Sequence, residues 1–244
     1  MAIDIKELEN FLNSRFSDVQ ESLVIGYANI KELLIGDLSD YKYCIVIGKK
    51  LDSTIIDTVK NGPTFEYLEL YNRVNAELNQ IGLELSGYLH SKKIPNKLIK
   101  PTGISKDVKN YNPRTLTYYF SHKMAATRAG LGWIGKTDLM VTKKFGPRVR
   151  FVSVLLKDHI QKNGIPIEKI VVPIIKSSCG SCSICIELCP AKAGNGKEWD
   201  INTDRDSFFN AYSCMEKCRE LSFKNLGKNE TICGICVEAC PIGK

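Results

Sequence analysis

The chain has 244 residues, of which 43% are hydrophobic and 25% charged, and its net charge is +7. These values are ordinary for a soluble globular protein and exclude a disordered or fibrous chain, and no run approaches the roughly 18 consecutive apolar residues of a membrane helix. The start, MAIDIKELENFL, is acidic where a signal peptide is basic, so we expect a cytoplasmic protein with no membrane partner.

The first ninety residues alternate between helical and extended patterns. Residues 4–16 have apolar side chains at helical spacing, and residues 22–30 fit a strand or a short helix. A β-branched run over 42–51 predicts a buried strand, with Cys44 as a packed core thiol. Residues 64–90 carry apolar side chains at steps of three and four, which predicts one long helix.

The segment 91–150 is strongly basic. It holds fourteen Lys and Arg residues against only Asp107 and Asp138. Such a segment favours a phosphate-bearing ligand, a nucleic acid or an acidic partner protein, and a solvated basic face is the alternative. Its polar first part, 91–114, predicts an extended loop.

The remaining elements before the cysteine-rich end are short. Residues 118–130 predict a helix, and strands are expected near 138–142 and 149–156. Residues 167–176 fit a last strand or a linker. The mixed order predicts an α/β or α+β domain over residues 1–175.

Nine of the ten cysteines lie near the carboxyl end, in two groups that each end in Cys-Pro. The groups are Cys179-x2-Cys182-x2-Cys185-x3-Cys189-Pro190 and Cys233-x2-Cys236-x3-Cys240-Pro241. This is the spacing of bacterial ferredoxins, in which three close cysteines hold one [4Fe–4S] cluster and the cysteine before proline reaches the other cluster. In a reducing compartment, such spacing favours metal binding over disulfides, and tetrahedral zinc is the alternative.

The spacing predicts two crossed ligand sets. Cluster one takes Cys179, Cys182, Cys185 and Cys240, and cluster two takes Cys189, Cys233, Cys236 and one further thiol. The second group has Glu230 where a first cysteine would stand, so the eighth ligand comes from Cys214 or Cys218, of which we prefer Cys214. Two adjacent clusters conduct single electrons, which predicts a relay between an external reductant and a group held by the first 175 residues.

A glycine-rich string stands out in that first part. We take as candidate cofactor-binding residues Arg128, Gly130, Leu131, Gly132, Trp133, Ile134, Gly135 and Lys136. Its glycines let backbone approach a flat ligand, Trp133 suits an aromatic or macrocyclic face, and Arg128 and Lys136 suit phosphate or amide oxygens. The string lacks the dinucleotide-binding fingerprint, so we do not predict NAD.

The string HKMAATRAGLGWIGKTDLMVTKKFGPRVRF, together with CGSCSICIELCP and ICGICVEACP, resembles the epoxyqueuosine reductase family, which is related to reductive dehalogenases. The resemblance implies a cobalamin-binding, nitroreductase-like α/β domain over 1–175. It also implies a ferredoxin-like double [4Fe–4S] module over 176–244, so the predicted fold class is α+β. It implies that the glycine-rich string lines the corrinoid site and that the clusters reduce the cobalt to a low-valent nucleophile. The crossed cysteine sets, with one ligand from the intervening segment, agree with this family.

The chain departs from the family in two places. The acidic proton-donor motif ahead of the glycine-rich string is replaced by LTYYFSHK, which leaves His122 or Tyr119 as the candidate catalytic proton donors. The sequence ends four residues after Cys240, so we expect a short member without the C-terminal helical-repeat extension.

These observations predict an oxidoreductase that passes electrons from reduced ferredoxin or flavodoxin to a bound cobalamin. The alternatives are a corrinoid-reducing electron carrier that acts on a corrinoid protein, an FMN-dependent reductase, and a genuine epoxyqueuosine reductase with tRNA as its partner. The absent acidic motif favours the electron carrier over the tRNA reaction. The small-molecule substrate itself is not specified by the sequence.

Overall fold

The computed structural model describes residues 2–31, 33–102 and 111–244, and the chain divides into two compact units. The first, here called the sheet unit, comprises Met1–Lys50, Asn75–Leu131 and Arg150–Ile174. The second, the cysteine unit, comprises Leu51–Val74, Gly132–Val149 and Ile175–Lys244. The chain passes from the sheet unit to the cysteine unit for the last time between Ile174 and Ile175, next to the expected domain boundary after residue 175. Two earlier segments, 51–74 and 132–149, also belong to the cysteine unit.

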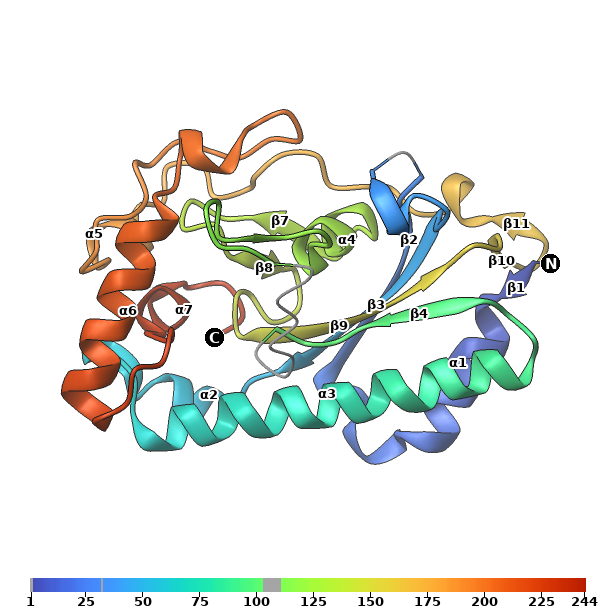
Figure 1. Cartoon of the computed structure of the whole chain (residues 1–244), viewed down its shortest axis with the longest axis horizontal. Helices are drawn as coiled ribbons and strands as arrows, with labels where there is room; N and C mark the ends of the chain where they lie inside the picture. Colours follow the sequence, from blue (N-terminus) through green and yellow to red (C-terminus); the bar gives the residue numbers. More distant parts are fainter. Residues whose placement is uncertain (1, 32, 103–110) are drawn as a thin grey trace. The chain divides into compact units, whose positions relative to one another are not determined.

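The sheet unit is built on four strands in the order β2-β3-β9-β4 (Figure 1). Their bounds are Leu23–Asn29, Tyr43–Lys50, Val149–Leu156 and Asn96–Ile99 in that order. β2 pairs antiparallel with β3, and β4 pairs antiparallel with β9. β3 is buried along nearly its whole length, and Cys44 within it is fully buried. Both predictions for this strand are therefore confirmed, because the β-branched run packs as a central strand.

Helices cover both faces of this sheet. Helix α1 (Ile5–Arg15) and the second half of α3 (Phe65–Ser91) lie on one face, and α4 (His122–Arg128) lies on the other (Figure 1). The Phe11 ring stacks on the Tyr88 ring with 4.2 Å between centroids, which joins α1 to α3. The three helices expected from the apolar spacing are confirmed.

Close approach of α3 to the sheet depends on a glycine. A methyl group added at Gly82 would lie 2.6 Å from a Leu98 carbon and 2.8 Å from a Val152 carbon, closer than packed atoms tolerate. β4, which contains Leu98, lies inside the segment 91–114 that the sequence predicted as a loop. That prediction is wrong for β4, because pairing with β9 rather than local hydrophobicity defines this edge strand. Residues 103–110 of the same segment lie outside the described residues.

Smaller elements complete the sheet unit. Strands β1 (Ile3–Asp4), β10 (Ile160–Lys162) and β11 (Ile165–Pro166) form a second sheet, and β5 (Tyr111–Asn112) pairs with β6 (Thr117–Tyr118). The segment 167–176 begins with a short 3-10 helix, Ile167–Lys169, and is not a strand. No helix of the described residues is long and apolar enough to cross a membrane.

The cysteine unit consists of short elements joined by loops. It contains α2 (Ser53–Ile56), β7 (Gly132–Ile134), β8 (Met140–Thr142), α5 (Ile184–Glu187), α6 (Ala211–Leu226) and α7 (Ile235–Ala239). β7 and β8 form a hairpin, so the glycine-rich string contains a strand that the sequence did not predict. A side chain at Gly132 would collide with the Val141 carbonyl oxygen at 2.0 Å, which explains this glycine.

Two polar anchors hold this unit together. The Arg148 side chain is fully buried and donates to an Asp57 carboxylate oxygen at 2.7 Å and to the Ser53 carbonyl at 3.3 Å. Its hydrogen bond lowers the pKa of Asp57. The Asn225 amide of α6 donates to the Asn61 and Pro63 carbonyls. The first anchor fixes the segment 51–74 to the segment 132–149, and the second fixes it to α6.

Candidate metal centre and cofactor hollow

The two cysteine groups are interleaved in space. All ten cysteines are free thiols, and nine lie in the cysteine unit. Burial raises the pKa of Cys240, and so does the negative charge of Cys185, Cys179 and Cys182. Cys240, from the second sequence group, therefore shares its surroundings with the first three cysteines of the other group.

The complementary set gathers around Cys236. Burial raises the pKa of this thiol, and the charges of Cys233, Cys214, Cys189 and Cys185 raise it further. Cys189, from the first sequence group, thus lies with the second group. Helices α5 and α7, which carry Cys185 and Cys236, are in contact, so the two thiol sets adjoin within the unit.

Both candidates for the eighth ligand lie at the second set, one turn apart on α6. Asn210 caps the start of this helix, where its side chain accepts from the Ser213 amide, and the sulfurs of Cys214 and Cys218 are 4.0 Å apart. Hydrogen bonding to Cys214 and Cys233 raises the pKa of Cys218. The same contacts lower the pKa of Cys214, and they lower that of Cys233 to about 7. These directions favour the thiol form at Cys218 and the thiolate form at Cys214 and Cys233.

No group of three or more His, Cys, Asp or Glu side chains in residues 2–31, 33–102 and 111–244 is arranged to hold a single metal ion. The nine thiols instead form two wider sets. Four thiolates around a [4Fe–4S] cube each bind a different iron, so they stand further apart than the ligands of one ion.

The second half of the glycine-rich string contacts the first cysteine loop. The Trp133 indole N–H donates to the Cys179 sulfur at 3.4 Å, and the indole is 8% exposed. The Lys136 ammonium donates to the Gly180 carbonyl at 2.7 Å and to the Cys182 carbonyl at 3.0 Å. These donors are used within the protein, and their contact with an added cofactor stays a prediction.

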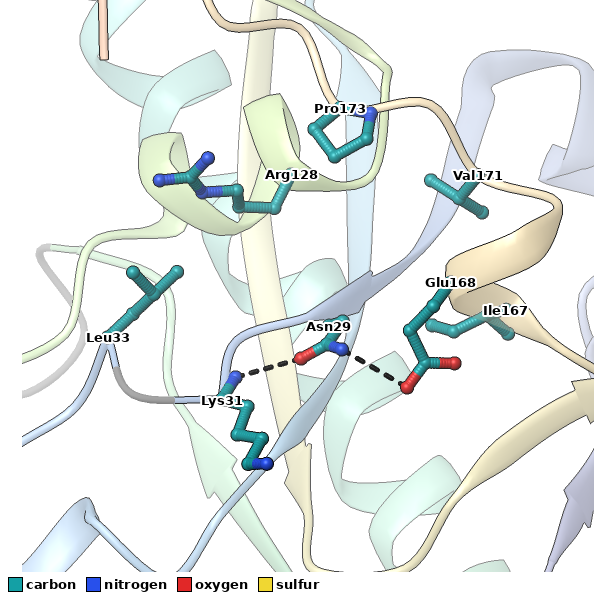
Figure 2. Close-up of a pocket in the computed structure, with 8 residues that line it drawn as sticks. All are labelled: Asn29, Lys31, Leu33, Arg128, Ile167, Glu168, Val171 and Pro173. Atoms are coloured by element: carbon teal, nitrogen blue, oxygen red, sulfur yellow. Dashed lines mark hydrogen bonds between the residues drawn. The ribbon is translucent and has the colours of Figure 1, made fainter.

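The first half of the string belongs to the sheet unit and borders a hollow of about 440 Å³ (Figure 2). The hollow is lined by Asn29, Lys31, Leu33, Arg128, Ile167, Glu168, Val171 and Pro173. Burial lowers the pKa of Arg128, and its Nε atom is buried with no hydrogen-bond partner among the described residues. Such a volume is typical of small-molecule sites.

Two lining residues, Asn29 and Glu168, belong to a chain of hydrogen bonds that continues behind the hollow. The Asn29 amide donates to a Glu168 carboxylate oxygen at 3.1 Å, and the Tyr43 hydroxyl donates to the same oxygen at 2.5 Å (Figure 2 draws the Asn29 contact). The Tyr43 oxygen also lies 2.6 Å from His159 Nδ1. Burial, followed by the Glu168 contact, raises the pKa of Tyr43. These residues were not predicted, because no motif links segments so far apart in the sequence.

The two candidate proton donors differ in their surroundings. His122 Nε2 donates to the Lys100 carbonyl at 3.1 Å, so Nδ1 accepts from the Ser153 hydroxyl at 2.8 Å. Burial lowers the pKa of His122 to about 4, which keeps the ring neutral at pH 7. Tyr119 is 59% exposed. The catalytic role of either residue stays a prediction.

Comparison with known proteins agrees with the cysteine pattern. The family model described as "4Fe-4S double cluster binding domain" matches residues 178–243. The epoxyqueuosine reductase of Leadbetterella byssophila is 30% identical over 122 residues, which is 49% of this chain and 36% of that protein. The chain resembles the epoxyqueuosine reductases. It spans about a third of the length of the curated relatives it matches.

Solved structures support the fold. A selenomethionine-labelled epoxyqueuosine reductase matches 98% of this chain and 66% of its own, with a TM-score of 0.58 at 17% identity. The catabolic reductive dehalogenase NpRdhA, in complex with 3-bromo-4-hydroxybenzoic acid, matches 91% of this chain and 30% of its own, with a TM-score of 0.58 at 15% identity. The chain therefore has an α+β fold that carries a double 4Fe–4S domain, as predicted, and the nitroreductase-like assignment stays a prediction.

Proposed function

We propose that this chain is an iron–sulfur oxidoreductase that passes electrons through two [4Fe–4S] clusters to a bound cobalamin. The observation that carries the proposal is the interleaving of the two cysteine groups, since a double-cluster module requires each Cys-Pro cysteine to serve the other cluster. The proposed ligands are Cys179, Cys182, Cys185 and Cys240 for cluster one, and Cys189, Cys214, Cys233 and Cys236 for cluster two.

The donor set fits these clusters. Each set has four thiols, none is engaged in a disulfide, and the ninth thiol, Cys218, is positioned to donate its S–H to two sulfurs of the second set. When bound, the clusters supply single-electron transfer, and hydrogen bonds to their sulfurs set the reduction potential. The chain itself holds the thiolates in place through the short helices α5 and α7 and the capped helix α6.

The hollow of the sheet unit fits a polar part of the cobalamin. The buried Arg128 Nε has an unused donor, and Lys31 adds a second cation to the lining of the hollow. Cobalamin carries a phosphate and amide oxygens that accept such hydrogen bonds, and it supplies a redox-active cobalt. FMN also carries a phosphate, so this site alone does not separate the two cofactors.

A second candidate is electron delivery without substrate chemistry of its own, in which the chain keeps the cobalt of a bound corrinoid or a corrinoid protein reduced. His122 favours it, because both ring nitrogens are hydrogen-bonded within the sheet unit and the ring is neutral. The sequence has no carboxylate between Asp107 and Asp138 to serve as an alternative proton donor.

The test is a cofactor analysis of the anaerobically purified chain. We expect about eight irons and about eight sulfides per chain. We also expect hydroxocobalamin to stay bound through desalting, with a shifted visible spectrum, in preference to FMN. Stoichiometric zinc would reject the clusters, and complete loss of cobalamin from cluster-loaded protein would reject the corrinoid site.

Turnover assays distinguish the electron carrier from the epoxyqueuosine reductase. Reduced ferredoxin or flavodoxin serves as the donor, and the acceptors are a corrinoid protein and a tRNA stem loop that carries epoxyqueuosine, the ligand named for one solved epoxyqueuosine reductase. Loss of the epoxide from the tRNA identifies an epoxyqueuosine reductase. Cobalamin reduction alone identifies the electron carrier.

A further inference from the structure

Two side-chain donors from outside the cysteine motifs reach the first cysteine loop, one at a sulfur and one at backbone carbonyls. Both come from the hairpin β7–β8 and its turn, and both belong to the cysteine unit. The Trp133 indole nitrogen lies 3.4 Å from the Cys179 sulfur, within hydrogen-bond range for a sulfur acceptor. The indole nitrogen is a hydrogen-bond donor and cannot accept, so Trp133 is the donor and the Cys179 sulfur is the acceptor.

The loop backbone brings this donor close. Gly135 lies against the same thiol, because a methyl group added there would be 3.7 Å from the Cys179 sulfur and 3.0 Å from a Val141 methyl. The indole is 8% exposed, so the N–H does not exchange this contact for water. The hairpin therefore presents a fixed N–H donor to Cys179.

Lys136 adds a buried positive charge to the same loop. Its ammonium donates to the carbonyls of Gly180 and Cys182, and the residue is 7% exposed. These carbonyls belong to the turn between the first two cysteines. The ammonium therefore holds the turn that positions Cys179 and Cys182, and it places a cation beside the first thiol set.

We propose that Trp133 tunes cluster one through a hydrogen bond from its indole N–H to the Cys179 sulfur, with Lys136 as the positioning residue that fixes the loop. This inference rests on the proposed function, because it requires a cluster on Cys179. Reduction adds one electron to the cluster, and its negative charge spreads onto the thiolate sulfurs. A donor to sulfur and a nearby cation stabilise that added charge, so both raise the reduction potential of cluster one.

The chain offers a matched control. It has two tryptophans, and Trp199 lies in the same unit, where its backbone carbonyl accepts from the Ser177 amide. Trp133→Phe removes the N–H and keeps an aromatic ring, and Trp199→Phe makes the same chemical change while it leaves the Trp133 N–H in place. Both variants are purified with clusters and titrated anaerobically, with the EPR signal of each reduced cluster as the readout.

At a fixed potential, Trp133→Phe is expected to lower the reduced-to-oxidised ratio of one cluster about two- to tenfold, as the loss of one neutral hydrogen bond predicts. The other cluster and both clusters of Trp199→Phe should keep wild-type ratios. Unchanged ratios in Trp133→Phe at full iron content overturn the inference and leave the proposed function intact. A wild-type chain without eight irons overturns both.

A second measurement covers the case in which Trp133→Phe fails to assemble. In Trp199→Phe, Trp133 is the only tryptophan, so labelling with indole-15N tryptophan marks its nitrogen alone. Pulsed EPR of the reduced clusters is expected to detect a 15N coupling in this variant. Its absence overturns the hydrogen bond to Cys179 whatever the Phe variant does.

Discussion

The two units of the chain depend on different kinds of interaction. The sheet unit has a continuous apolar core, with β3 buried along nearly its whole length and α1, α3 and α4 packed on the sheet. The cysteine unit relies on short elements, of which α5 has four residues and α7 has five, and on nine thiols. Helices this short are unstable alone, so their order depends on packing and on bound groups.

This difference separates the two proposed cofactors. Clusters would act as structural parts of the cysteine unit, because their ligands join segments that share little apolar core. A polar part of the cobalamin would occupy a hollow that the sheet unit forms without it. Five experiments test this contrast, beginning with the largest expected effect.

Crossed ligation gives the sharpest result. Cys189→Ser is expected to lose cluster two, and Cys240→Ser is expected to lose cluster one. Each variant should keep about four irons, because each of these two cysteines binds the cluster held mainly by the other sequence group. Cys189→Ser should thus match the EPR spectrum of Cys236→Ser, and Cys240→Ser that of Cys182→Ser. Cys44→Ala, at the chain's one thiol outside the cysteine unit, should keep about eight irons. Uncrossed pairing of the spectra would refute the ligand sets.

The eighth ligand is tested on α6. Cys214→Ala is expected to lose cluster two, whereas Cys218→Ala is expected to keep it, because hydrogen bonding lowers the pKa of Cys214 and raises that of Cys218. Iron analysis and EPR check both variants. The reverse result would assign the ligand to Cys218.

Removal of the clusters is expected to affect the two units unequally. After anaerobic chelation, amide hydrogen exchange should accelerate at least about tenfold in α5 and α7, since local opening is governed by the contacts that remain. The amides of β3 should keep their protection. Equal acceleration in both units would mean that the clusters support the whole chain.

Arg128→Gln tests the hollow of the sheet unit. Loss of a charged donor to the cobalamin is expected to weaken its binding about tenfold, measured by visible titration of the cluster-loaded chain. Arg73→Gln, at an exposed position on α3, is the control and should bind as wild type does. The iron content should be unchanged in both. Wild-type affinity in Arg128→Gln would place the cobalamin elsewhere.

Two glycines of the sheet unit give the smallest effects, in opposite directions. Gly26→Ala places a methyl 2.6 Å from the Ala129 side chain and is expected to lower the free energy of unfolding by about 1–3 kcal/mol. Gly87→Ala meets no atom within 4 Å and lies within α3, so it should raise the same quantity by about 0.5–1 kcal/mol. Denaturant unfolding of the two variants tests the packing of α4 on β2.

The sequence predicted the parts that depend on local spacing. The long helix over 64–90 follows from its apolar period, and the double-cluster domain follows from thiols whose separations along the chain match a cluster loop. The α6 pair needed tertiary information, because both Cys214 and Cys218 stand at suitable distances in the sequence. The hydrogen bonds of Cys218 with Cys214 and Cys233 are what favour Cys218 as the S–H donor and Cys214 as the thiolate ligand.

Other features could not be predicted from residue patterns. The hollow joins Asn29, Arg128 and Glu168, which lie about 100 and 40 residues apart in the sequence and have no shared motif. Trp133 suggested a ligand face, but its indole N–H meets a thiol 46 residues further along the chain. Such pairings follow from how the hairpin β7–β8 packs, which no local propensity specifies.

Electron flow from the clusters to the corrinoid tests the central claim most directly. The cluster-loaded chain is reduced, freed of excess reductant and mixed anaerobically with hydroxocobalamin, and EPR and visible spectra are recorded over time. We predict that the reduced-cluster signals decay at the same rate at which the bound corrinoid changes its visible spectrum. Clusters that stay reduced beside bound, spectrally unchanged cobalamin would contradict the account.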